Sequence, residues 1–162
     1  MSEASAESAV SVREFRAGDE AAFRRLNEEW ITRFFELEPK DEETFADPQG
    51  KILAQGGRIL LAVDRERAVG CCALVAMGPG EFEVAKMAVT PEYQGRGVGR
   101  LVLERTVALA REMGARRLYL ETNHALEPAI RLYRAVGFQD VPAERFTLSP
   151  YARADVHMEM WL

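Results

Sequence analysis

The feature that most limits what this chain can fold into is a glycine cluster between two regular patterns. A mainly apolar run at 83–89 is followed by a proline-bearing loop and then by a helical pattern over about 97–113. The loop closes on three alternating glycines, Gly95, Gly97 and Gly99. Glycine lets the backbone approach a ligand closely, and the first N–H groups of a helix have no internal partner. The segment therefore predicts a site for phosphate oxygens.

A dinucleotide-binding fold is the main alternative for such a turn. Glu121 ends another expected strand about 20 residues later, as that fold's ribose-binding acid does. However, the glycines are spaced G-x-G-x-G, and the loop after Val89 is longer than the tight first turn of that fold. We expect Arg96 and Arg100 to add positive charge at the rim of the phosphate site.

Hydrophobic periodicity predicts the remaining elements. Apolar side chains from Phe23 to Leu37 form a helical stripe that we expect to begin at an N-cap, Asp19, and to end at Pro39. A second, short helix is predicted over 47–56, and a further helix over 125–136. Strands are expected at 10–16, 58–64, 68–77, 81–89, 117–121, 138–141 and 155–162.

The turns at 65–67 and 78–80 are so short that the strands they join must be antiparallel neighbours. We therefore predict a mixed α/β domain, a twisted and largely antiparallel sheet of about seven strands with helices on both faces. This domain is expected over 10–162, after a disordered tail at 1–9. The adjacent Cys71 and Cys72 should point to opposite faces of a strand, which argues against a disulfide or a metal site.

Composition excludes several classes of function. The net charge of -5 and the sequence pI near 5.2 argue against a nucleic-acid-binding protein. No apolar run approaches the roughly 20 residues of a membrane-spanning helix, and the first residues lack a secretory signal. We therefore expect a cytoplasmic protein without a membrane or nucleic-acid partner.

Two segments resemble signature motifs of the GNAT superfamily of N-acetyltransferases. Residues 94–99, QGRGVG, match the pattern Q/R-x-x-G-x-G/A, and residues 129–138, AIRLYRAVGF, look like A-I-x-L-Y-x-x-x-G-F. They occur in the family's order, and the resemblance extends from about residue 10 to the end of the chain. It implies a GNAT-like fold and transfer of an acetyl group from acetyl-CoA to a primary amine.

The resemblance also implies where the acetyl-CoA would bind. Main-chain groups of the strand at 83–89 would pair with the pantetheine arm as an added strand does. The N–H groups of the glycine turn would hold the pyrophosphate, and an asparagine after the next strand would contact the cofactor. The residues implied are Met87, Val89, Gln94, Gly95, Arg96, Gly97, Val98, Gly99, Arg100 and Asn123.

Acetyl transfer to an amine needs a deprotonated amine, a stabilised oxyanion and a proton for the leaving thiolate. The family motif places Tyr133 near the cofactor sulfur as the acid, although a tyrosine packed on the helix is the alternative. Glu83 is the first candidate for the base. Glu81 lies two residues away on the same face, and His124 is a weaker candidate. If the amine of the acceptor has a low pKa, it is already deprotonated, and no protein base is needed.

The sequence contains no motif that identifies the acceptor. We expect the acceptor site to be built from residues 30–43 and 142–153, with a small molecule or an amino acid as the favoured acceptor. The acidic residues between 36 and 43 could attract a cationic amine, although such charge runs usually face solvent. A homodimer is a family-based expectation. The alternative function is a GNAT-like module that binds or senses acyl-CoA without turnover.

Overall fold

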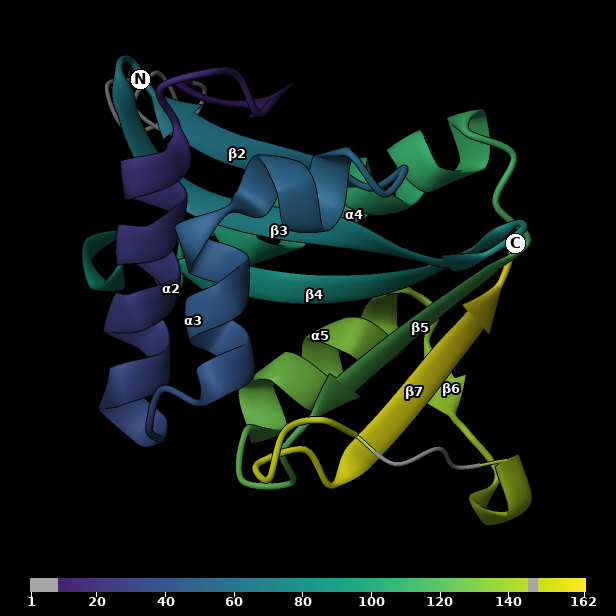
Figure 1. Cartoon of the computed structure of the whole chain (residues 1–162). Coiled ribbons are helices and arrows are strands. Elements are labelled where there is room, and N and C mark those ends of the chain that lie inside the picture. The colour runs from purple at the N-terminus through teal and green to yellow at the C-terminus, as the bar shows by residue number, and fades with distance from the viewer. Residues whose placement is uncertain (1–8, 146–148) are drawn as a thin grey trace.

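One mixed sheet with helices on both of its faces organises the chain in the computed structural model, which describes residues 9–145 and 149–162 (Figure 1). Its seven strands lie in the order β1-β2-β3-β4-β5-β7-β6. All neighbouring strands are antiparallel except β4 and β5. This confirms the predicted fold class. The strands are β1 Val10–Glu14, β2 Arg58–Asp64, β3 Arg67–Gly78, β4 Glu81–Val89, β5 Arg117–Thr122, β6 Gln139–Asp140 and β7 Val156–Trp161.

The helices form a layer on each face of the sheet. In Figure 1, α2 and α3 lie in front of the central strands, and α4 and α5 lie behind them. The bounds are α2 Glu20–Phe34, α3 Pro39–Ala46, a π-helical turn η1 Gln49–Leu53, α4 Val98–Glu112 and α5 Glu127–Val136, with 3-10 turns at Pro91–Tyr93 and Ala143–Arg145.

Two separate apolar clusters result, and Cys71 belongs to one and Cys72 to the other. Both cysteines are buried and free, as the alternation along β3 predicts.

The parallel contact between β4 and β5 is very short. Residues 81–83 of β4 pair with residues 117–119 of β5. Figure 1 shows the two ribbons meeting near their beginnings and diverging along their length. Within the described residues, the edge of β4 beyond Glu83 has no strand beside it.

β4 also carries a bulge next to this divergence. Its register with β3 changes from Cys71 opposite Ala88 to Ala73 opposite Ala85, so β4 holds one extra residue there. Lys86, within this interval, has a φ of 55°, a left-handed conformation that a lysine rarely adopts. The bulge redirects the strand at the wall of the divergence.

One expectation about the first helices was wrong, and two were confirmed only in part. Pro39 does not end a helix but begins α3, where its missing N–H costs nothing because the first turn has no acceptor for it. The helix predicted over 47–56 is the short π-helical turn after Pro48. Asp19 is the N-cap residue of α2, as predicted, but its side chain pairs with Arg13 at 2.7 Å and makes no capping bond to the helix.

The predicted division into a tail at 1–9 and a domain at 10–162 stays a prediction, because residues 1–8 lie outside the described part. Within that part, no helix is both long and apolar enough to cross a lipid bilayer.

Candidate active site

A cavity of about 570 Å³ occupies the space where β4 and β5 diverge. It is lined by α2, β4, the glycine turn, β5, the start of α5 and part of the segment 149–155, which we call the strap. Both predicted catalytic residues, Glu83 and Tyr133, line this cavity. Nine of the ten predicted cofactor-binding residues also line it, and Arg96 does not. The nine are Met87, Val89, Gln94, Gly95, Gly97, Val98, Gly99, Arg100 and Asn123.

The glycine turn depends on backbone conformation. Gly95 has a φ of 78°, and Gly97, the N-cap of α4, has a φ of 79°. These values lie in the left-handed region, where glycine avoids the steric cost that a Cβ would bring. A Cβ at either position would meet no protein atom within 4 Å, so the backbone angle, and not crowding, explains the glycine.

Side chains of the turn fix its shape. Gln94 donates from Nε2 to the Val89 carbonyl at 3.1 Å, and the Arg96 guanidinium lies over the Tyr93 ring at 4.9 Å. The first helical bond of α4 runs from the Leu101 N–H to the Gly97 carbonyl at 3.0 Å. The amides just before Leu101 therefore have no helical acceptor and are suited to an anion. Together with the adjacent open edge of β4, this end of the cavity fits a diphosphate joined to an extended arm.

Asn123 lies at the other side of the cavity, where its side chain holds protein groups. Its Nδ2 donates to the Arg153 carbonyl at 2.7 Å, and its Oδ1 accepts from the Ala125 N–H at 2.9 Å. The asparagine thus ties the strap to the segment that leads into α5. Its predicted contact with the cofactor stays a prediction.

Tyr133 reaches the cavity from α5. It is 9% exposed, and its ring packs edge-on against Phe138 with centroids 6.1 Å apart. Burial raises the pKa of its phenol above the ordinary value, so the hydroxyl keeps its proton at neutral pH. Within 9–145 and 149–162 that hydroxyl has no hydrogen-bond partner, which leaves it available as a donor to a ligand.

Glu83 and Glu121 bring two carboxylates to the cavity from the diverging strands. Burial, and then repulsion from Glu121, raise the pKa of Glu83 to about 7. Glu121 accepts hydrogen bonds from the Tyr119 hydroxyl at 2.8 Å and from Ser149 Oγ at 2.6 Å. A carboxyl group that titrates near neutrality can accept a proton from a bound ammonium group.

The other two candidates for a base lie elsewhere. Glu81 forms an ion pair with Arg117 at 3.0 Å and is not among the cavity-lining residues. The His124 side chain is 77% exposed and pairs with Asp155. Of the three carboxylate and imidazole candidates, Glu83 is the one that lines the cavity.

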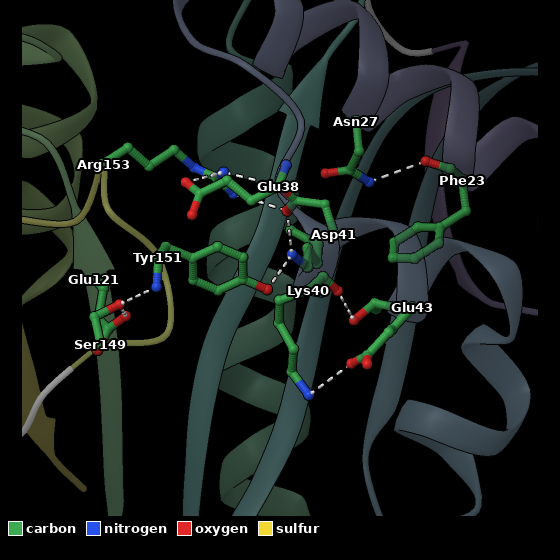
Figure 2. Close-up of polar contacts among 12 residues, drawn as sticks. Phe23, Asn27, Glu38, Lys40, Asp41, Glu43, Glu121, Ser149, Tyr151 and Arg153 are labelled. Carbon is green, nitrogen blue, oxygen red and sulfur yellow. Dashed lines mark hydrogen bonds and ion pairs between the residues drawn. The ribbon is translucent and has the colours of Figure 1, made fainter.

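Sequence reasoning missed a buried ionic network at the acceptor side, which we call the bridge and define as Glu38, Asp41, Lys86, Tyr151 and Arg153. Figure 2 shows Tyr151 and Arg153 of the strap reaching toward Asp41 and Glu38. The Lys86 ammonium donates to Asp41 at 2.9 Å and to the Tyr151 hydroxyl at 2.7 Å. Arg153 donates to both oxygens of Asp41, at 2.8 and 2.9 Å, and to Glu38 at 3.1 Å.

The bridge is electrically balanced in a buried place. Burial of Asp41 works to raise its pKa, but hydrogen bonds from Arg153 and the Glu38 amide, with the charge of Lys86, lower the pKa to about 2. Burial lowers the pKa of Lys86 despite the nearby carboxylate. Lys86 is the sequence signal that could have predicted the bridge, because a lysine inside an apolar strand needs a buried acidic partner.

The acidic residues between 36 and 43 do not form an attractor for a cationic amine, which was the alternative to a solvent-facing run. Glu38 and Asp41 are held in the bridge, Glu42 pairs with Arg24 at 2.6 Å, and Glu43 lies 3.6 Å from Lys40. Within the described part, none of the acidic side chains of this run lines the cavity. Their charges stabilise α3 and its contacts, so the carboxylates at the cavity come from β4 and β5 instead.

Comparison with known proteins gives a consistent result over most of the chain. The model of the family described as "Acetyltransferase (GNAT) family" matches residues 21–138. An uncharacterised N-acetyltransferase of Schizosaccharomyces pombe is 31% identical over 122 residues, which cover 72% of this chain and 74% of that protein.

Solved structures share the fold at low sequence identity. A crystal structure of a GNAT-family acetyltransferase from Staphylococcus aureus superposes with a TM-score of 0.85 and 15% identity, covering 94% of this chain and 98% of that one. An acetyltransferase from Salmonella typhimurium, solved with its cofactor acetyl-CoA, superposes with a TM-score of 0.74 and 18% identity, covering 94% of each chain.

Proposed function

This chain belongs to the GNAT acetyltransferase family, and on that premise we propose that it transfers an acetyl group from acetyl-CoA to the primary amine of an acceptor. The observation that carries the proposal is a single cavity with two differently built ends. One end offers main-chain amides and an open strand edge. The other end offers a carboxyl group, Glu83, whose pKa of about 7 suits proton transfer.

The donor would be held mainly by main-chain groups. The amides at the start of α4 would bind the diphosphate, and Arg100 would add charge at its rim. The β4 edge at Met87 and Val89 would hydrogen-bond the pantetheine arm and direct an amide at the reacting carbonyl. Acetyl-CoA would supply the thioester that is to be cleaved. The acetyl-CoA complex of the Salmonella typhimurium neighbour supports acetyl-CoA as the donor.

The proton transfers would be divided between two side chains. Glu83 would accept the proton that the acceptor's ammonium group must lose before its nitrogen can form the new C–N bond. As the C–S bond breaks, the Tyr133 hydroxyl would donate its proton to the sulfur. The second proton on the new amide nitrogen would then be released and restore the tyrosine.

A thiol-release assay with acetyl-CoA and a panel of primary amines tests this function, together with calorimetric titration of acetyl-CoA alone. We expect acetyl-CoA to bind and at least one amine to release CoA with formation of its N-acetyl product. Binding without turnover across the panel would favour the acyl-CoA-binding or sensing module instead. Tighter binding of NAD than of CoA would contradict the assignment of the glycine turn.

A further inference from the structure

The charges that line the cavity differ in how completely they are compensated. Among the described residues, the charged side chains at the wall are Glu83, Lys86, Arg100, Glu121 and Arg153. Arg100 belongs to the glycine turn and pairs with Glu104 at 2.8 Å. The acceptor side therefore contains two cations and two carboxylates, and their partners decide which charges a ligand would meet.

Both cations are already paired by the bridge. Lys86 and Arg153 bind Asp41, which is 0% exposed, and Arg153 also binds Glu38. A ligand carboxylate could recruit either cation only by leaving Asp41 with fewer partners in a buried place. Breaking a buried ion pair on one side is strongly unfavourable because the remaining charge has lost its solvent. These two cations are thus not free to bind an acceptor carboxylate.

The two carboxylates are compensated less completely, by the charge of Lys86 near Glu83 and by a long contact of Glu121 with His157. Glu83 makes no hydrogen bond or ion pair with the residues described. Glu121 accepts from the neutral hydroxyls of Tyr119 and Ser149. His157 is not among the cavity-lining residues, and its Nδ1 lies 3.9 Å from the Glu121 carboxylate and 2.7 Å from the Tyr119 hydroxyl. A cation entering the cavity would relieve the repulsion between the two carboxylates.

The remaining surroundings favour a compact, apolar body behind the amine. Trp30 and Phe34 of α2 and Phe35, which directly follows it, line the same cavity. The strap runs across the acceptor side, where Ser149 binds β5 and Arg153 binds α3. This crossing leaves space for a small molecule more readily than for an extended polypeptide.

We propose that the acceptor is a small primary amine with an apolar body and no carboxylate beside the amine, whose ammonium group binds between Glu83 and Glu121. The inference rests on the proposed function and narrows it. A free α-amino acid would bring its carboxylate next to the same two glutamates. Like charges placed together in a partly desolvated site disfavour binding, so free amino acids are rejected.

Three acceptors with the same ring and amine test the inference: phenethylamine, phenylalanine and phenylalaninamide. We expect kcat/KM for phenethylamine and phenylalaninamide to agree within about tenfold. We expect phenylalanine to be about 100-fold poorer, because it differs from its amide chiefly in charge. Equal or better use of phenylalanine would overturn the inference and leave the proposed function intact.

A variant pair assigns the discrimination to Glu121. Glu121→Gln keeps a hydrogen-bond acceptor for Ser149 but removes the charge. The KM for phenethylamine should therefore rise about tenfold, and the ratio of kcat/KM for phenethylamine to that for phenylalanine should fall to about tenfold. Glu112→Gln removes the same charge from the exposed end of α4 and should change neither value. An unchanged ratio in a folded Glu121→Gln protein would overturn the inference.

Three further outcomes separate the proposals. A peptide that begins with phenylalanine and is preferred over phenethylamine by more than about tenfold would overturn the small-molecule assignment but not the acetyl transfer. If acetyl-CoA binds and only other amines of the panel release CoA, this inference fails and the proposed function stands. If no amine of the panel releases CoA, these acceptors and the peptide included, both fail.

Discussion

The two ends of the cavity are built in opposite ways. The glycine turn is one continuous stretch, 94–100, whose binding groups are main-chain amides held by positive φ angles at Gly95 and Gly97. The acceptor end is assembled from side chains of α3, β4, β5 and the strap, and its central ion pair joins Asp41 to Arg153 across a separation of 112 residues.

This difference determines what each end tolerates. A main-chain site survives most side-chain changes but fails when a residue cannot adopt the required φ. A balanced ionic network does not depend on an unusual backbone angle, but it is destabilised when one of its charges is removed. The two ends should therefore respond to different classes of substitution, and the following experiments test that separation.

The largest expected effect lies between the two ends, at Tyr133. Replacement of Tyr133 by phenylalanine removes the proton donor and keeps the packing against Phe138, so kcat should fall by about 10²–10⁴-fold. Affinity for acetyl-CoA and the melting temperature should hardly change. Single-turnover rates would check that chemistry is being measured. A wild-type rate under those conditions would exclude Tyr133 as the acid.

The next largest effect is on stability, at Asp41. Asp41→Ala leaves Lys86 and Arg153 without their shared buried partner, and the free energy of unfolding should fall by about 3–5 kcal/mol. Urea unfolding would measure it. Glu43→Ala, on the same helix but exposed, should stay within about 0.5 kcal/mol of the parent protein. Equal effects of the two substitutions would show that the bridge contributes little.

A pH profile sharpens the description of the acceptor end. Glu83 must be ionised to accept a proton, and its pKa is raised to about 7. Hence kcat/KM should be constant above pH 7 and should fall about tenfold per unit below it, reaching about 100-fold at pH 5. Glu83→Gln should abolish this fall below pH 7 and leave kcat/KM low and independent of pH. A fall with the same midpoint in that variant would point to another titrating group.

The smallest effect is expected from the matched pair Gly97→Ala and Gly99→Ala. At Gly97 the φ of 79° costs an alanine about 1–2 kcal/mol, and the turn should lose CoA affinity as it shifts. At Gly99, inside α4, a Cβ meets Leu132 and Val89 at an ordinary 3.7 Å, so alanine should be neutral or stabilising by up to about 1 kcal/mol. Urea unfolding and CoA titration would compare them. Identical results for both would contradict the backbone explanation.

How far the sequence could predict the site follows from the same contrast. The glycine turn and Tyr133 belong to contiguous motifs, and hydrophobic periodicity was enough for the seven strands. The bridge joins residues that are far apart in the chain, and no local pattern records which acid meets Lys86. Pro39 shows a smaller ambiguity, because a proline can end one helix or open the next, and only packing decides between them.

The short seam between β4 and β5 has a consequence beyond making room for ligands. Main-chain hydrogen bonds couple strands into cooperative units. Among the described residues, β1–β4 and the group β5, β7 and β6 are joined by the short ladder of 81–83 with 117–119 and by bonds from the Arg116 and Arg117 N–H groups to the Gly80 carbonyl. We therefore expect native-state hydrogen exchange to resolve two sets of amides with different opening free energies. The smaller set would open first, and the chain would unfold in two stages.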